Sequence, residues 1–222
     1  EAEIEYHDHI STTIFARFPV VKTSLDIIND FEIIIWTTTP WTMPGNRAVA
    51  YGKDIDYSLI EVTNVGENSL SKIGDKIIIA KELVEDVMKE ISVLSFNSSN
   101  TLKGSDFAGT VLAHPLNNNG YEHEVLLLEA DFVTTDQGTG FVHIAPGHGA
   151  DDFELGRQNN LPIPETVSDN GILNSDLPLL GGLRVLKDNE IIADIMSEHN
   201  ALIGRGKLNH SYPHSWRSKA PL

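Results

Sequence analysis

Residues 36–46 read Trp-Thr-Thr-Thr-Pro-Trp-Thr-Met-Pro-Gly-Asn and follow the apolar run Ile33-Ile34-Ile35. The β-branched run has the composition of a buried strand, so the three threonines stand where that strand ends. Two prolines stiffen the following turn and remove two backbone donors. The segment fits a plain β-edge with a proline-rich turn. It equally fits a rigid wall of neutral hydroxyl groups between two tryptophans, suited to a nucleoside or another small polar molecule.

A second segment, residues 138–154, reads Gly-Thr-Gly-Phe-Val-His-Ile-Ala-Pro-Gly-His-Gly-Ala-Asp-Asp-Phe-Glu. It concentrates four glycines, two histidines and two aspartates. Glycine permits close backbone approach, so Gly147-His148-Gly149 predicts a tight turn between a strand and a helix. This second cluster of polar groups decides between the two interpretations in favour of a pocket.

The two segments together resemble the editing domain of isoleucyl-tRNA synthetases. That domain, called connective polypeptide 1, is an insertion in the catalytic Rossmann body of those enzymes. Valyl and leucyl relatives typically carry Thr-Thr-Arg-Pro and then an acidic residue, whereas this chain has Thr39 and Trp41 at those places. The closing run His-Ser-Tyr-Pro-His-Ser-Trp-Arg-Ser-Lys-Ala-Pro-Leu resembles the return to the body. The resemblance implies one editing domain over residues 1–222, with 1–20 and 203–222 as its connections to the rest of the synthetase in cis.

The hydrophobic pattern predicts an α+β, β-rich fold, with a barrel-like mixed sheet decorated by short helices. Short β-branched and aromatic runs predict strands at residues 13–20, 31–36, 47–51, 57–63, 76–80, 91–96, 107–113, 125–133 and 139–144. Helical spacing of apolar residues predicts helices at 81–90 and 188–199, with a short third helix at 150–159. Polar loops are expected at residues 66–71 and 97–103, and a hairpin turn at 117–120.

Composition limits what the chain binds by itself. Its 222 residues carry a formal net charge of −16, and phosphate contacts need lysine or arginine, so an autonomous tRNA-binding module is excluded. Residues 201–222 soften this objection, because they hold no acidic residue and four basic ones: Arg205, Lys207, Arg217 and Lys219. No run approaches the ~20 apolar residues of a membrane span. We expect a cytoplasmic domain that is monomeric in isolation and makes no membrane contact.

The resemblance implies hydrolysis of the ester between a misplaced amino acid and the ribose of the adenosine at the tRNA 3′ end. Such an ester is already activated, so a well-placed water suffices if the carbonyl oxygen is stabilised. The chain has no cysteine and no evident Ser-His-Asp order, which disfavours a covalent mechanism. By resemblance, Thr37, Thr38 and Thr39 hold the adenosine and the attacking water, with Thr38 and Thr39 catalytic. Trp36 and Asn46 are expected to line the same pocket.

A carboxylate is needed for the α-ammonium group of the misplaced amino acid, because a buried cation must be paired. Asp151 and Asp152 compete for this role. Asp151 and Glu154 have the spacing of a capping box for the helix that follows. The functional aspartate of the resembled family is the second of the pair. We therefore assign the cap to Asp151 and the substrate ammonium, with a catalytic role, to Asp152.

Two histidines accompany this motif. A lone histidine on a strand is more often a hydrogen-bonded core residue, but the surrounding motif favours His143 as the wall that limits side-chain size. His148 is assigned to substrate binding too, although its place in the turn fits a structural residue equally well. Both histidines with Asp152 would also suit a metal site. The resembled family needs no metal for this step, so no metal ligand is assigned.

The resemblance further implies valine as the misplaced amino acid. Isoleucyl-tRNA synthetase is itself the standard example of limited discrimination, since one methylene is worth only about 1–3 kcal/mol in a single site. A second site that admits valine and excludes isoleucine multiplies the selectivity. The expected substrate is Val-tRNA(Ile), with valyl-adenylate as a second one.

The chain lacks the His-Ile-Gly-His and Lys-Met-Ser-Lys-Ser signatures of class I synthetases. ATP and Mg²⁺ therefore belong to the absent synthetic domain, and editing is expected to need no cofactor. Two alternatives stay open. One is a catalytically silent module that positions the tRNA 3′ end, and the other is a metal-dependent esterase of small molecules.

Overall fold

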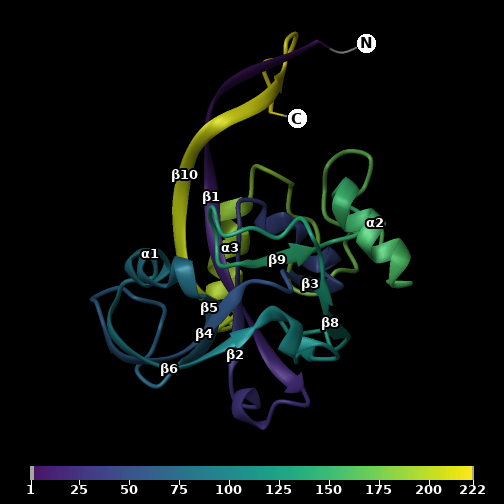
Figure 1. Cartoon of the computed structure of the whole chain (residues 1–222). Coiled ribbons are helices and arrows are strands. Elements are labelled where there is room, and N and C mark those ends of the chain that lie inside the picture. The colour runs from purple at the N-terminus through teal and green to yellow at the C-terminus, as the bar shows by residue number, and fades with distance from the viewer. Residues whose placement is uncertain (1–2, 222) are drawn as a thin grey trace.

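The computed structural model describes residues 3–221, and this range contains ten strands and three α-helices. The strands are β1 (Ile4–Lys22), β2 (Glu32–Thr37), β3 (Ala48–Tyr51), β4 (Asp56–Val65), β5 (Lys76–Ala80), β6 (Val93–Lys103), β7 (Val111–Ala113), β8 (Glu124–Glu129), β9 (Phe141–Ile144) and β10 (Leu202–Ser215). The helices are α1 (Val84–Glu90), α2 (Ala150–Gln158) and α3 (Asn189–Glu198), and a 3-10 turn, η2, covers Pro40–Gly45. This confirms the β-rich α+β class (Figure 1).

All ten strands belong to one mixed sheet. Its order is β6-β4-β5-β2-β1-β7-β8-β3-β9, with β10 paired to β1 outside this path. β2 runs parallel to β5 and β3 runs parallel to β8, whereas the other pairs are antiparallel. The long β1 joins the two halves, because residues 14–19 pair with β2 and residues 20–22 pair with β7.

The sheet is open, which corrects the barrel-like closure expected from the sequence. β6 and β9 are its edges, and within residues 3–221 no ladder joins them. Most side chains of β6 are exposed, so this strand has no apolar face to bury inside a closed wall. Residues 97–103 were expected as a loop and are strand instead, because antiparallel β4 supplies their backbone hydrogen-bond partners.

The outer half of β1 and β10 form a two-stranded ribbon that leaves the body of the domain (Figure 1). At its far end, Ile4 near the start of β1 pairs with Ser215, the last residue of β10. The sequence pattern predicts neither β10 nor the outer part of β1, because both segments are rich in polar residues and lack a continuous apolar run. Cross-strand pairing and ring contacts, such as His9 against Tyr212 with centroids 5.0 Å apart, hold the ribbon together.

The core supports the strand ends that carry the site. Residues 33–35 of β2 and 77–79 of β5 are isoleucines without solvent exposure, and they pack with apolar side chains of α1 and α3. A smaller apolar cluster, which includes Ala48, Ile144 and Leu155, holds α2 against β3 and β9. β2, β9 and α2 are therefore fixed relative to one another. Among the described residues, no helix is both long and apolar enough to cross a membrane.

Candidate functional site

The candidate site is a small pocket between the end of β2, η2, β9 and the start of α2. Its volume is about 170 Å³. The lining consists of Trp36, Thr37, Thr39, Thr42, Val142, His143, Ala145, His148 and Asp152. The fold thus gathers most of the predicted site residues, although Thr38 and Asn46 do not line the pocket. No sequence pattern singles out Thr42, which joins the lining because η2 brings it to hydrogen-bonding distance of His143 on β9.

Thr37 and Thr39 form the hydroxyl wall. Thr37 ends β2 and is held opposite Ile14 of β1. The two threonine hydroxyl oxygens lie 3.1 Å apart, and the backbone N–H of Thr39 donates to Thr37 Oγ1 at 3.1 Å. This arrangement brings both hydroxyls to the same side, whereas Thr38 between them is left outside the lining. Each hydroxyl has one proton and two lone pairs, so the wall retains capacity for a water molecule.

His143 forms a second wall and is held from both ends of its ring. It lies on β9 opposite Val49 and is 8% exposed. Asn46 Nδ2 lies 2.8 Å from His143 Nδ1, and Thr42 Oγ1 lies 3.0 Å from His143 Nε2. Burial, with a smaller contribution from His148, lowers the pKa of His143 to about 3. The imidazole is therefore neutral at physiological pH.

Asn46 supports His143 from behind. Its side chain has no exposed surface, and its Nδ2 also donates to the Ala48 carbonyl at 2.8 Å. Its Oδ1 is buried without a hydrogen-bond partner in the described part of the chain. Asn46 thus contacts the pocket only through the imidazole of His143, whereas the family resemblance implies that it lines the pocket itself.

Asp152 contributes the one carboxylate of the pocket lining. It lies in the first turn of α2, and its Oδ1 accepts a hydrogen bond from the Ala145 backbone N–H at 2.7 Å. Burial raises the pKa of Asp152; the Ala145 hydrogen bond opposes this shift, and the Asp151 charge adds to it. Within the described range, no cationic side chain contributes to that pKa. The positive end of the helix dipole helps to keep the carboxylate charged.

Asp151 is not the cap of α2, which corrects the sequence assignment. The N-cap residue is Gly149, and no side chain forms a capping hydrogen bond there. The helix begins before the position that a capping box of Asp151 and Glu154 requires, so these residues lie inside its first turns. Asp151 is exposed, and Glu154 pairs with Arg157 at 2.8 Å.

Gly149→Ala is expected to displace the Asp152 carboxylate. The φ of −163° at Gly149 is open to any residue, but a Cβ there would lie 2.4 Å from Asp152 Oδ2. The carboxylate must shift and weaken its bond to Ala145, and a hydrogen bond to a charged group contributes about 1.5–3 kcal/mol. Gly147→Ala is the matched control, since its Cβ would meet no atom closer than 3.4 Å. Thermal unfolding checks this, and equal melting temperatures of the two variants would contradict it.

His148 closes the pocket beside α2. Its Nε2 lies 2.7 Å from Thr166 Oγ1, and its ring packs edge-on against Trp41 with centroids 5.1 Å apart. Burial lowers the pKa of His148, so this imidazole also favours the neutral form. His148 is therefore fixed by contacts within the fold, as a structural residue would be, and it also lines the pocket.

The metal interpretation of His143, His148 and Asp152 gains no support from their contacts. Both ring nitrogens of His143 are engaged by side chains, and Nε2 of His148 is engaged by a threonine hydroxyl. In the part of the chain that the structure describes, no group of three or more His, Cys, Asp or Glu side chains is arranged to hold a metal ion.

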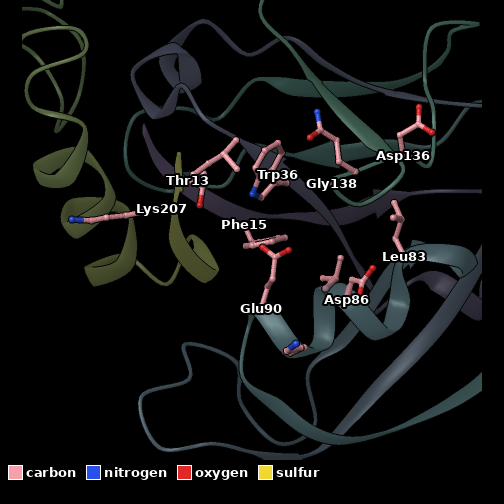
Figure 2. Close-up of a pocket in the computed structure, with 13 residues that line it drawn as sticks. Thr13, Phe15, Trp36, Leu83, Asp86, Glu90, Asp136, Gly138 and Lys207 are labelled. Carbon is pink, nitrogen blue, oxygen red and sulfur yellow. The ribbon is translucent and has the colours of Figure 1, made fainter. Parts of the chain in front are cut away.

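A larger cavity of about 470 Å³ adjoins the pocket through Trp36, which lines both. Figure 2 shows its walls, which come from β1, β2, α1, β10 and the loop at residues 136–138. The walls combine apolar surface with charged groups, namely Asp86, Lys89, Glu90, Asp136 and Lys207. Burial and the neighbouring Asp86 raise the pKa of Glu90. The sequence does not predict this cavity, because its walls come from separate segments that only the fold brings together.

The basic residues near the end of the chain are largely neutralised. Arg205 pairs with Glu190 at 2.6 Å and with a second carboxylate, and Lys219 pairs with Glu5. Lys207 Nζ also lies 3.5 Å from Glu190. Three of the four basic side chains in residues 201–222 are therefore paired with carboxylates. This corrects the expectation that the segment offsets the acidic character of the chain.

The sequence and the fold of this chain match known proteins. The family model described as "Leucyl-tRNA synthetase, editing domain" matches residues 59–178. The isoleucine–tRNA ligase of Gluconobacter oxydans is 46% identical over 235 residues, which cover 100% of this chain and 24% of the relative. The ligase of Pelagibacter ubique is 45% identical over 222 residues, with the same shares covered. The crystal structure of GlLeuRS-CP1 matches with a TM-score of 0.65 and 13% identity, over 87% of this chain and 98% of that chain.

The chain belongs to the family of aminoacyl-tRNA synthetase editing domains that this model describes. Along its whole length it is homologous to part of the isoleucine–tRNA ligases, as the two sequence motifs predict. It spans 24% of the length of these curated relatives. The likeness to GlLeuRS-CP1 confirms the fold of the β-rich editing domain.

Proposed function

We propose that this chain removes valine from mischarged Val-tRNA(Ile) by hydrolysing the ester to the 3′-terminal adenosine. The observation that carries the proposal is the carboxylate of Asp152, which is partly buried in a small pocket of neutral hydroxyls and imidazoles and has no cationic partner among residues 3–221. A buried ammonium group requires such a counter-charge. Similarity to isoleucine–tRNA ligases supports valine as the amino acid, because valine is one methylene smaller than isoleucine.

Water is the attacking group in this proposal. It occupies the hydroxyl wall of Thr37 and Thr39, while Asp152 fixes the ammonium group, so the ester carbonyl carbon is presented to the water oxygen. The water oxygen forms the new bond to that carbon, and the bond from the carbon to the ribose oxygen breaks. A proton from water ends on the ribose hydroxyl, and valine leaves. Thr38 and Thr39 remain the predicted catalytic pair, and Thr39 is the one of the two that lines the pocket.

His143 acts as the sieve. Its imidazole is neutral and both ring nitrogens are hydrogen-bonded, so it has no free basic nitrogen for proton transfer. It excludes by bulk instead, in a pocket of only about 170 Å³. A rigid wall discriminates one methylene, because close-packed surroundings resist added volume at a cost of roughly 1–3 kcal/mol.

The small pocket is too small for the whole aminoacyl-adenosine, since typical ligand sites measure roughly 300–1,000 Å³. We place the adenosine beyond Trp36, at the mouth of the larger cavity, with the indole as a stacking surface. Valyl-adenylate shares the valyl and adenosine parts, so it is a second substrate. The acidic domain leaves the remaining tRNA contacts to the rest of the synthetase in cis.

The proposal includes no cofactor for editing, because water and polar side chains supply the chemistry. ATP and Mg²⁺ serve only the synthetic domain of the larger ligase. We place the domain in the cytoplasm, where tRNA is charged, and expect it to be a monomer when isolated.

Thr39→Val is expected to slow deacylation of Val-tRNA(Ile) more than Thr38→Val. Valine keeps the shape of threonine and removes the hydroxyl, which leaves a polar partner unmet at a cost of about 1–3 kcal/mol, or roughly 5- to 150-fold in rate. Of these two residues, Thr39 lines the pocket, and its hydroxyl contacts that of Thr37. Single-turnover deacylation by both variants gives the comparison. A larger loss for Thr38→Val would move the catalytic hydroxyl to that residue.

A chelator separates this proposal from the metal-dependent esterase. Hydrolysis of Val-tRNA(Ile) by the chain should be unchanged after EDTA treatment, because no step uses a metal. Loss of hydrolysis with EDTA and recovery with Zn²⁺ would favour the esterase. Binding of the tRNA 3′ end without any hydrolysis would favour the silent positioning module.

A further inference from the structure

We propose that the ribbon of β1 and β10 is a pH-sensitive element of the fold, whose strands separate at acidic pH when a cluster of imidazoles takes up protons (Figure 1). The imidazole cluster consists of four histidines: His7, His9, His210 and His214. The sequence holds the two pairs far apart, and the pairing of β1 with β10 brings them together. The proposal concerns the ribbon alone and does not depend on the proposed hydrolysis.

The register of the ribbon puts all four imidazoles on one face. Directly opposite residues of an antiparallel pair share a face, as do alternate residues of one strand. The pairs on this face are His9 with His210, His7 with Tyr212 and Glu5 with His214. The ring centroid of His214 lies 5.3 Å from that of His7 and 5.8 Å from that of His9. The centroids of His9 and His210 are 6.4 Å apart, so the four rings form one contiguous cluster.

The centre of the cluster is withdrawn from water. His214 is 7% exposed, and the chain after β10 turns back so that a bridge joins His214 to Pro221. His9 and His210 are half-buried. Burial lowers the pKa of His9, and the charges of His214 and His210 lower it further. The closed ribbon therefore favours the neutral form of His9.

Little negative charge faces the cluster to compensate for added protons. The titratable neighbours on this face are Glu5 on β1, Tyr212 on β10 and Lys219 in the turn after β10. Glu5 Oε2 lies 3.1 Å from His7 Nε2, but the same carboxylate oxygen already pairs with Lys219. Asp8 lies on the opposite face, where it pairs with Ser211, and β10 contains no acidic residue. Extra positive charge on the cluster is therefore left largely unpaired.

Protons favour the open ribbon because the open strands bind them more tightly. A histidine in water titrates at about pH 6.5, whereas the pKa of His9 in the closed ribbon is lower. The stability of the closed ribbon is complete above the pKa of the open form, and it declines as the pH falls from there towards the pKa of the closed form. A second proton adds repulsion between neighbouring rings.

The ribbon can open without unfolding the sheet. Residues 4–13 of β1 pair only with β10 within the described range, because the pairing with β2 begins at Ile14. A two-stranded ribbon has marginal stability by itself, so its opening requires less free energy than unfolding of the packed sheet. The isoleucine core beneath β2 and β5 holds no residue of the cluster.

Opening of the ribbon reaches the larger cavity. Ser11 Oγ lies 2.9 Å from His210 Nε2, and Ser11 pairs with Leu208 across the ribbon. Thr13, Lys207 and Leu208 line the cavity of about 470 Å³. Separation of the strands to this level removes part of the cavity wall. The consequence for adenosine binding rests on the proposed function, whereas the separation itself does not.

Amide hydrogen exchange of the whole chain is the first test, with intrinsic exchange rates corrected at each pH. Protection of residues 4–12 and 207–215 should fall by about fivefold or more between about pH 7.5 and about pH 5.5. The amides shared by β4 and β5 should keep their protection, because their pairing involves no histidine. A smaller fall in the ribbon, or an equal fall in β4 and β5, would overturn the proposal.

His9→Gln is the second test, and His199→Gln is its matched control. Glutamine keeps a polar side chain and cannot titrate, so His9→Gln should make the fall in ribbon protection at least about twofold smaller than in the wild type. His199 is an exposed histidine at the end of α3, outside the ribbon, and its variant should respond as the wild type does. Each variant is compared with itself at the higher pH, so a general change in ribbon stability does not count.

A response of His9→Gln equal to that of the wild type, or the same loss of response in both variants, would overturn the proposal. Neither measurement uses tRNA. Failure of the pH response and failure of the proposed deacylation are therefore separate results.

Discussion

Asp152→Asn is expected to remove most deacylation of Val-tRNA(Ile) and leave the domain at least as stable as the wild type. Asparagine keeps an oxygen that accepts the Ala145 N–H, which bonds Asp152 Oδ1 at 2.7 Å, and loses only the charge. The ammonium group of the substrate is then buried without a partner. Breaking such a pair costs about 2–5 kcal/mol, or roughly 30- to 5,000-fold in rate.

The sign of the pH dependence follows from the same residue. Burial raises the pKa of Asp152, so its carboxylate takes up a proton at a higher pH than an exposed aspartate. Wild-type deacylation should fall as the pH drops through this raised pKa, since a neutral carboxyl group cannot pair with ammonium. The buried negative charge of Asp152 also lowers the free energy of unfolding. This penalty is complete at a pH above the pKa of the folded state, and it disappears at a pH below the pKa of the unfolded state. Asp152→Asn removes this penalty at neutral pH.

Asp151→Asn is the matched control for that experiment. Asp151 is the exposed neighbour in the same helical turn and makes no capping hydrogen bond. Losing its favourable interaction with the helix dipole should change stability by about 0.3–1 kcal/mol and leave the ammonium pairing intact. Deacylation rates and melting temperatures of the two variants decide the assignment. Equal loss of deacylation in both would show that Asp152 is not the ammonium partner.

His143→Ala is expected to let the domain hydrolyse cognate Ile-tRNA(Ile). The imidazole is a buried, neutral wall, and its removal opens space for the methylene that separates isoleucine from valine. Exclusion by overpacking is worth roughly 1–3 kcal/mol, so Ile-tRNA(Ile) hydrolysis should rise by about tenfold or more relative to Val-tRNA(Ile). The variant also leaves Asn46 and Thr42 without their shared partner, so its folding must be verified by circular dichroism.

Both deacylation rates have to be measured in the same His143→Ala protein. A histidine that served as general base would make the two rates fall together and leave their ratio unchanged. That outcome would also require a ring with a free basic nitrogen, in conflict with the hydrogen bonds to both ring nitrogens. An unchanged ratio would move the discriminating contact to another part of the pocket.

Much of the sheet could be predicted from local patterns. The isoleucine runs at 33–35 and 77–79 are β-branched and fully buried, so their strands follow from the sequence alone. The ribbon of β1 and β10 could not be predicted this way, because its strands are polar and are held by pairing between distant segments. The open edge at β6 is also a tertiary property, since residues 97–103 become strand only through β4.

The lining residues of the candidate site could also be predicted, whereas the contacts that support them could not. The family resemblance carried by the two motifs implies that Thr37, Thr39, His143 and Asp152 share one pocket, and the structure gathers them there. The supporting contacts could not be predicted, because the Asn46–His143 bond joins residues 97 positions apart. The cap assignment failed for a local reason, since the spacing of a capping box does not show where a helix begins. Gly149 starts α2 earlier, and this leaves Asp152 in the first turn, facing Ala145.

The central claim is that this pocket hydrolyses valine from tRNA(Ile) and spares isoleucine. The most direct test mixes the purified chain, in excess, with Val-tRNA(Ile) or Ile-tRNA(Ile) and follows release of the labelled amino acid. The account predicts hydrolysis of the valyl ester well above its spontaneous rate, and roughly tenfold or more faster than that of the isoleucyl ester. Equal rates for the two esters, or a valyl rate no higher than the spontaneous one at concentrations where the tRNA is shown to be bound, would contradict it.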